Sequence, residues 1–185
     1  MTIIGWESKY REILRDFGYS RKKDNQSCKL LNSLLGKNTR TNVIRDLIKN
    51  KPVFVIGAGP SLPSCISILK KHKKITKIVA DGATKAIIEN GLKPDIVVTD
   101  LDGDMTSLKK AGRTNTIMIV HAHGDNSEKL SFAKNFKNCI GTTQAKPMGK
   151  VNNFGGFTDG DRCCLLYTSD AADEGLGVDL GGRRI

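Results

Sequence analysis

The stretch KPDIVVTDLDGD, residues 93–104, decides the fold of this chain. Its β-branched run IVVT is followed at once by three aspartates, Asp100, Asp102 and Asp104. A nearly continuous run of this kind is typical of a strand that is buried on both faces, as in a parallel sheet. Ligands of such sheets bind beyond the carboxyl ends of the strands, near the point where the strand order reverses. We therefore expect the three carboxylates to reach a binding site.

Similar apolar runs lie on both sides of this stretch. VFVI, ITKIVA and TIMIV alternate with amphipathic stretches that are typical of helices, the last of which follows Asn126, and a fifth run ends in GTTQ. Strands that alternate with helices in this way favour a parallel sheet with helices on both faces. The sequence therefore predicts an α/β fold with a doubly wound, mainly parallel sheet.

The regions outside this pattern divide the chain further. Between Trp6 and Ile48 apolar residues recur at steps of three and four, which is typical of helices. The last stretch, which contains CCLLYTSDAADE and GVDLGGRRI, resembles the translation of a sequencing adapter. We therefore expect a helical N-terminal segment (1–50), an α/β domain that is truncated at its C-terminal end (51–163) and a tail that is not natural protein (164–185).

The composition is that of an ordinary globular protein, with 38% hydrophobic and 26% charged residues. No run approaches the roughly 18 apolar residues of a membrane span, and no signal peptide is recognisable, so we expect a cytoplasmic protein without a membrane partner. The five cysteines show no CxxC spacing, which argues against a disulfide framework or a zinc finger. The net charge of +11 could attract RNA or an anionic nucleotide.

The acidic motifs predict a metal site. ADGA places Asp81 and Gly82 at the end of one expected strand, and TDLDGD places three more carboxylates at the end of the next. Carboxylates this close repel one another unless a cation or a proton compensates them. Mg²⁺ prefers oxygen ligands, usually carboxylates, phosphates and water. A calcium EF-hand loop is the competing pattern, but this motif follows a strand and lacks the glutamate at the twelfth position.

The motif IGAGPSL, after the first expected strand, suggests a phosphate-binding turn. Gly57 and Gly59 would let backbone amides approach a phosphate, and the helix that starts after Ser61 would add a partial positive charge. The motif is neither a complete GxGxxG nor a Walker sequence, so its spacing alone is a weak signal. A tight turn with Ser61 as helix N-cap is the alternative.

The motif HAHGDN adds polar groups at the same edge of the sheet. His121 and His123 are two residues apart on a strand, so they project to one face, and with Asp125 they could bind a transition metal. A phosphate contact or proton transfer by His123 is the interpretation we favour, because no third nitrogen or sulfur ligand is apparent. GTTQ and NNFGGFTDGDR complete a set of polar strand ends.

Taken in order, GAGPSL, VADGATKAIIENGLKPDIVVTDLDGD, HAHGDN, TTQ and NFGGFTDGDR resemble the archaeal 6-hydroxymethyl-7,8-dihydropterin pyrophosphokinases across residues 52–162. The stretch from ADGA to DLDGD is also similar to the catalytic domain of thiamin pyrophosphokinase. The resemblance implies Mg²⁺-dependent transfer of the terminal diphosphate of ATP to a dihydropterin, with release of AMP, in folate or tetrahydromethanopterin synthesis. It also raises the expectation of a homo-oligomer.

The resemblance also implies roles for individual residues. Catalysis would involve Asp100, Asp102 and His123, where His123 or a carboxylate takes the hydroxymethyl proton. Nucleotide binding would involve Gly57, Gly59, Ser61, Asp81 and Gly82. The metal ligands would be Asp81, Asp100, Asp102, Asp104 and Asp125. Contacts to the substrate would come from Thr143, Gln144, Asn153, Asp159 and Arg162.

Two other functions compete with this interpretation. Motility accessory factors that transfer sugars from nucleotide carriers have a similar GAGPSL and DGA core, although they are much longer. A nucleotide- or RNA-binding module without catalytic activity would fit the positive charge, but aromatic residues make up only 5% of the chain and no stacking platform is recognisable. We therefore expect no specific nucleic-acid partner.

Overall fold

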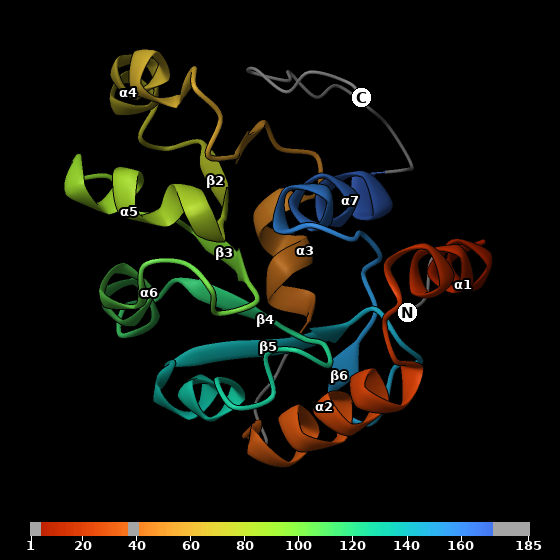
Figure 1. Ribbon diagram of the computed structural model, residues 1–185. Coiled ribbons are helices and arrows are strands. Elements are labelled where there is room, and N and C mark those ends of the chain that lie inside the picture. Colours follow the sequence, from red (N-terminus) through yellow and green to blue (C-terminus); the bar gives the residue numbers. More distant parts are fainter. Residues whose placement is uncertain (1–4, 37–40, 172–185) are drawn as a thin grey trace.

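The computed structural model describes residues 5–36 and 41–171, and a parallel sheet of six strands forms its centre (Figure 1). The strands are β1 Val53–Ile56, β2 Thr76–Ala80, β3 Ile96–Thr99, β4 Ile117–Ala122, β5 Asn138–Thr143 and β6 Val151–Asn152. Every neighbouring pair is parallel. The predicted α/β fold with a parallel sheet is confirmed.

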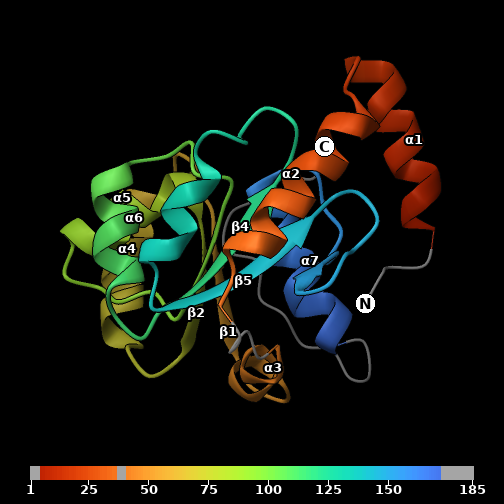
Figure 2. The same cartoon turned by 90° about the horizontal axis from the view of Figure 1, so that it is seen from below.

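The six strands follow one another in chain order, so this part of the chain has no reversal of strand order. Right-handed crossovers between successive neighbours place the connecting helices on one face. The connecting helices on that face are α4 Leu62–Lys71, α5 Asp81–Glu89, α6 Met105–Gly112 and the 3₁₀-helix η1 Leu130–Asn135. The opposite face is covered by α3 Asn42–Ile48 and α7 Asp159–Ala171 (Figure 2). Helices thus lie on both faces, as predicted, but the site cannot be located from a reversal of strand order.

Alternate strand side chains supply two hydrophobic cores. Val79 and Val97 are partners in the register of β2 and β3 and pack in the core under α4, α5 and α6. Ile78 and Ile96, one residue earlier in each strand, pack in the core under α3 and α7. Every residue of β3 is buried. This explains why the strand sequences are continuous apolar runs and do not alternate between apolar and polar residues.

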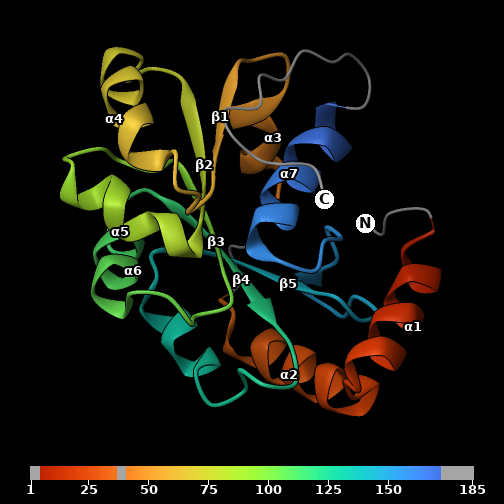
Figure 3. The same cartoon turned by 45° about the horizontal axis from the view of Figure 1, so that its top comes forward.

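The first two helices, α1 Trp6–Phe17 and α2 Arg21–Leu34, lie at the β4–β6 end of the sheet (Figure 3). Helix α2 packs on β4, β5, β6 and η1. Gly141 of β5 makes this approach close, because a Cβ there would lie 3.1 Å from Cδ2 of Leu31. Since α2 occupies this part of the face, the helix expected after Asn126 is only a short 3₁₀-helix. The division of the chain at residue 50 stays a prediction.

The tail predicted for residues 164–185 begins inside α7, where Leu166 is buried in the second core, and residues 172–185 lie outside the described part. Among the described residues, no helix has both the length and the apolar character required to cross a membrane. The predicted origin of the tail stays a prediction.

One buried carboxylate connects the N-terminal helices to the sheet. Asp24 of α2 is 2% exposed. Its Oδ2 accepts hydrogen bonds from the Tyr10 hydroxyl at 2.6 Å and from Nε2 of Gln144 at 2.8 Å. Its Oδ1 accepts one from the backbone N–H of Gly124 at 2.7 Å. A buried anion is tolerated when its oxygens are satisfied in this way, so Asp24 fixes α1 and α2 against the loop that follows β4.

Removal of the Tyr10 hydroxyl should weaken this connection. We expect Tyr10→Phe to lower the free energy of unfolding by about 1.5–3 kcal/mol, the range for a hydrogen bond to a charged group. Urea denaturation followed by circular dichroism measures the effect. Tyr19→Phe is the matched control, because Tyr19 is 39% exposed and its side chain makes only ring contacts among the described residues. Equal stability of the two variants would contradict the role given to Asp24.

Candidate active site

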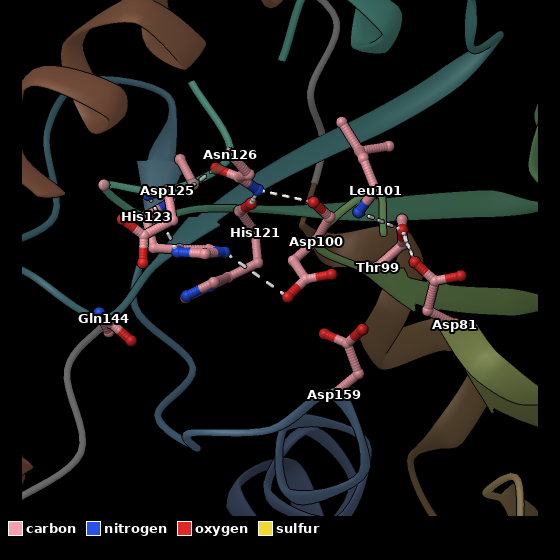
Figure 4. A network of polar contacts seen from close by, with 12 residues as sticks. Asp81, Thr99, Asp100, Leu101, His121, His123, Asp125, Asn126, Gln144 and Asp159 are labelled. Carbon is pink, nitrogen blue, oxygen red and sulfur yellow. Dashed lines mark hydrogen bonds and ion pairs between the residues drawn. The ribbon is translucent and has the colours of Figure 1, made fainter. Parts of the chain in front are cut away.

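Four aspartates converge at the carboxyl edge of the sheet. Asp81 begins α5 directly after β2, Asp100 and Asp102 follow β3, and Asp159 begins α7. One carboxylate oxygen from each residue lies within 4.8 Å of the corresponding oxygen of every other. Figure 4 shows Asp81, Asp100 and Asp159 of this group. The structure thus brings together three of the predicted metal ligands. It adds Asp159, for which the sequence predicted a substrate contact.

The turn after β3 is held in an unusual backbone conformation. Leu101 has a φ of 69°, a left-handed value that costs a non-glycine residue about 1–3 kcal/mol. Its side chain is 1% exposed, and its N–H donates to Thr99 Oγ1 at 2.8 Å. The Thr99 hydroxyl in turn donates to Oδ2 of Asp81. Thr99 therefore connects the ends of β2 and β3, and the turn directs Asp100 and Asp102 toward Asp81.

The cluster fits a divalent cation. Oδ1 of Asp81 and Oδ1 of Asp100 are buried, and neither has a hydrogen-bond partner in the described part of the chain. Buried oxygens without a partner are costly, and a cation would satisfy them. All four groups offer oxygen, which suits Mg²⁺ or Mn²⁺ better than zinc. No histidine belongs to this cluster, so the alternative of a site built on His121 and His123 gains no support among the described residues.

The electrostatics of the cluster point the same way. Burial raises the pKa of Asp159 to about 7, although the nearby charge of Arg162 opposes the shift. A hydrogen bond with Asp100, followed by burial, raises the pKa of Asp102 to about 6. Burial also raises the pKa of Asp81, against the hydrogen bond from the Thr99 hydroxyl. Without a cation, protons compensate part of the negative charge.

His123 faces Asp100. Its Nε2 lies 3.5 Å from Oδ2 of Asp100, and its Nδ1 accepts the backbone N–H of Asp125 at 3.4 Å. Because Nδ1 is an acceptor, the proton of a neutral ring lies on Nε2, the atom that faces the carboxylate. Burial would raise the pKa of Asp100, but hydrogen bonds from His123 and Asp102 overcome this effect and lower the pKa to about 2.

Two further residues complete this corner of the site. His121 is buried and stacks on His123, with ring centroids 5.8 Å apart (Figure 4). Burial, followed by the charge of Arg162, holds the pKa of His121 well below its usual range, so the ring is neutral. Asn126 donates from Nδ2 to the backbone oxygens of Asp100 and His121, at 2.7 Å each. Asn126 therefore fixes the end of β4 against the turn after β3.

A cavity of about 370 Å³ opens in front of the carboxylates. Some of the residues that line it were predicted: Asp100, Asp102, His123, Asp125, Gln144, Asp159 and Arg162. Sequence reasoning missed the other lining residues: Gly18, Tyr19, Ser20, Lys23, Asp24, Gly124, Phe157 and Thr158. Gly18 marks a helix end in the sequence, but no local pattern places that turn against strands that lie about a hundred residues further along the chain.

Other predicted site residues lie outside this cavity. The loop with Gly57, Gly59 and Ser61 contacts the start of α5, since a Cβ at Gly82 would lie 3.2 Å from Cβ of Ala58. This loop therefore lies close to Asp81, and neither the loop nor Asp81 lines the cavity. Its predicted contact with nucleotide phosphate stays a prediction.

Three predicted residues have structural partners instead. Asp104 does not join the acidic cluster, because its Oδ1 accepts the N–H of Ser107 at 2.8 Å and caps α6. The Thr143 hydroxyl donates to the backbone oxygen of Ala122 at 3.1 Å. Asn153 is 1% exposed. Its side-chain Nδ2 donates hydrogen bonds to two backbone oxygens, and its Oδ1 accepts one from a backbone N–H. The predicted metal and substrate contacts of these three residues are thus not supported by the geometry.

Gly103 should be essential for the metal site. A Cβ at this position would overlap the Asp81 carboxylate and would lie 2.7 Å from its Cγ. We expect Gly103→Ala to displace Asp81 and to weaken Mn²⁺ binding by about 10- to 100-fold, the range for a disturbed partner of a metal ligand. Isothermal titration calorimetry measures the affinity. Gly160→Ala, whose Cβ would meet Thr158 Oγ1 at 3.7 Å, is the control and should bind Mn²⁺ normally.

Metal binding should also depend on pH. The raised pKa values of Asp159 and Asp102 mean that, as the pH rises from about 4 to 7, these groups lose their protons later in the folded than in the unfolded chain. The metal-free protein therefore loses stability over this range, and a cation restores it. Because Asp102 is the more exposed group, Asp159 should contribute more. We expect Mg²⁺ to raise the melting temperature more at pH 8 than at pH 6. An equal increase at both values would contradict this linkage.

The comparisons with known proteins agree with the geometry. The family model described as "6-hydroxymethylpterin diphosphokinase MptE-like" matches residues 26–171. The 6-hydroxymethyl-7,8-dihydropterin pyrophosphokinase of Methanocaldococcus jannaschii is 44% identical in an alignment 196 residues long, gaps included. The alignment covers 98% of this chain and 81% of that protein. Enzymes of the same name from Pyrococcus furiosus (43%; 96% of this chain, 78% of the relative) and Methanothermobacter thermautotrophicus (40%; 98% and 80%) are also similar. The chain therefore belongs to the MptE-like 6-hydroxymethylpterin diphosphokinases, a family of diphosphate-transferring enzymes.

Proposed function

We propose that the protein transfers the terminal diphosphate of ATP to the hydroxymethyl group of 6-hydroxymethyl-7,8-dihydropterin, in a Mg²⁺-dependent reaction that releases AMP. The observation that carries this proposal is the set of four aspartate oxygens, mutually within 4.8 Å, at the wall of a cavity. The names of relatives that are 40–44% identical to the chain support the pterin acceptor over the sugar-transferase alternative.

The proposed reaction exchanges one P–O bond for another. The acceptor oxygen forms a bond to the β-phosphorus of ATP, and the bond between that phosphorus and the oxygen bridging to the α-phosphate breaks, so AMP leaves. Mg²⁺, when bound, would neutralise negative charge on the diphosphate. Asp81, Asp100 and Asp102 would hold the cation, and Asp159 lies close enough to act as a fourth ligand.

Arg162 orients Asp159 rather than acting as a free cation. Its Nη1 donates to Oδ1 of Asp159 at 2.7 Å, and its Nη2 donates to the backbone oxygen of Phe157 at 2.6 Å. The residue is 4% exposed, and its Nε has no partner in the described part of the chain. Arg162 therefore supports the site electrostatically, because its charge favours the ionised form of the nearby carboxylates.

The hydroxymethyl proton has two candidate acceptors, His123 and a carboxylate of the cluster. The ring orientation favours a carboxylate, because Nδ1 of His123 accepts a backbone N–H and Nε2 faces Asp100 as a donor. In this arrangement His123 stabilises the charge of Asp100 and positions it for the cation. The predicted role of His123 as a proton acceptor thereby becomes a positioning role.

We place the nucleotide at the loop between β1 and α4. The N-terminus of the ten-residue helix α4 is not capped by the side chain of Ser61 in the described structure. The free N–H groups of a helix N-terminus attract phosphate. Gly57 has open space around its Cα, and the loop contacts the start of α5 beside Asp81. Phosphates on this loop would therefore lie close to the carboxylates that hold the cation.

The proposal is tested by removing one carboxylate charge. We expect Asp100→Asn to reduce AMP release by more than about a hundredfold, since even the partners of metal ligands contribute about 10- to 100-fold. The assay supplies ATP, Mg²⁺ and 6-hydroxymethyl-7,8-dihydropterin and measures AMP. Asp104→Asn is the matched control, because Asp104 caps α6 and lies outside the cluster, so its activity should stay near that of the unmodified protein.

Two outcomes would count against the proposal. AMP release by Asp100→Asn at the normal rate would remove Asp100 from the site. The reaction itself would be refuted if AMP release by the unmodified protein did not depend on the presence of the pterin. Circular dichroism of Asp100→Asn should show an intact fold, because the change alters one charge on a residue that retains its shape.

A further inference from the structure

Three aromatic rings form a cluster at the mouth of the cavity. Phe17 ends α1, Tyr19 lies in the turn to α2, and Phe157 lies in the loop before α7. The ring of Phe17 stacks on Phe157, with centroids 5.1 Å apart, and on Tyr19, with centroids 5.8 Å apart. Phe17 is 59% exposed and Tyr19 is 39% exposed. Such exposure is unfavourable for large apolar rings and is characteristic of a binding surface.

The fold fixes both sides of this aromatic cluster. Gly18 has a left-handed φ of 67°, which turns the chain so that Phe17 and Tyr19 lie side by side. On the other side, the backbone oxygen of Phe157 accepts Nη2 of Arg162 at 2.6 Å. Gly156 permits this contact, because its φ is 84° and a Cβ there would lie 2.7 Å from the backbone nitrogen of Arg162. The rings are thus held by the backbone rather than only by each other.

The aromatic cluster and the carboxylates share one cavity. Tyr19 and Phe157 line the same space as Asp100, Asp102 and His123. A ligand in this space would therefore be able to contact both the aromatic rings and residues of the metal site. Flat heterocycles stack on aromatic side chains because both present π faces. The cavity, at about 370 Å³, is near the lower end of the roughly 300–1,000 Å³ typical of ligand sites, which favours a small bicyclic ring over a whole nucleotide.

We propose that Tyr19 and Phe157 stack the pterin ring of the acceptor and direct its hydroxymethyl group toward the acidic cluster. This inference rests on the proposed function. The adenine ring is the competing occupant, but the glycine loop proposed for ATP lies beside the start of α5 and does not line the cavity. The donor and the acceptor would then reach the carboxylates from different parts of the site. Phe17 supports both rings from behind without lining the cavity.

The experiment measures binding and turnover separately. Binding of 6-hydroxymethylpterin is followed by its fluorescence in the presence of Mg²⁺, and KM is determined for the dihydropterin and for ATP. We expect Tyr19→Ala and Phe157→Ala to weaken pterin binding roughly 5- to 150-fold, the equivalent of about 1–3 kcal/mol per stacked base. The KM for ATP should not change. Tyr19→Phe, which keeps the ring, should restore the affinity.

The control is Leu30→Ala. Leu30 is 40% exposed on α2 and does not line the cavity, so this variant should bind pterin normally. Unchanged pterin affinity in both alanine variants would overturn the inference, and so would an increase in the KM for ATP alone, which would assign the rings to adenine. If the unmodified protein binds pterin in a ring-dependent manner but releases no AMP, the proposed reaction fails while this binding site stands.

Discussion

Four carboxylates whose oxygens lie within 4.8 Å of one another repel strongly, and the rest of the structure has to oppose that repulsion. The parallel register places the ends of β2 and β3 side by side, and the Thr99 hydroxyl bonds to Asp81 across them. The left-handed conformation of Leu101 adds to the free-energy cost of assembling the cluster, and the burial of its side chain offsets that cost. A site of this kind is stable only with protons or a cation in it.

The sequential order of the strands decides how the cluster is assembled. Because the crossover helices occupy one face, the opposite face is available to α7, which returns from the C-terminal side of the chain. Asp81 therefore comes from the helix layer on one face, and Asp159 comes from the layer on the other. The carboxylates of β3 lie between them. Residues from the two helix layers thus meet in the acidic cluster at the carboxyl edge of the sheet.

The part of the site that follows directly from strand ends could be predicted from the sequence. Asp81, Asp100 and His123 each lie within three residues of a strand, so their convergence follows from the parallel sheet alone. The place of Asp159 beside these carboxylates could not be predicted, because it depends on the packing of α7 against the sheet. Asp104 shows how proximity in sequence differs from proximity in space: a local hydrogen bond from the N–H of Ser107 holds its side chain at the cap of α6, outside the cluster.

Other residues that line the cavity were beyond prediction for a different reason. Tyr19 lies in the turn between α1 and α2 and Lys23 lies in α2, and the apolar pattern of these helices reports only which helix face is buried. Their position depends on long-range contacts, such as the bond from Trp6 Nε1 to the backbone oxygen of Gln144 at 2.7 Å. A single sequence contains no local signal for contacts of this kind. The fold class was therefore predictable, while the shape of the cavity was not.

Asp24 has a consequence for how variants of this enzyme are interpreted. It touches no phosphate in the arrangement described above. Its three hydrogen bonds nevertheless connect helices α1 and α2 to the loop that carries His123 and to the end of β5. A substitution there would lower activity in a genetic screen and would be mistaken for the loss of a chemical group. Amide hydrogen exchange in α1 distinguishes the two cases, because detachment of the helix accelerates exchange whereas the loss of a reactive group does not.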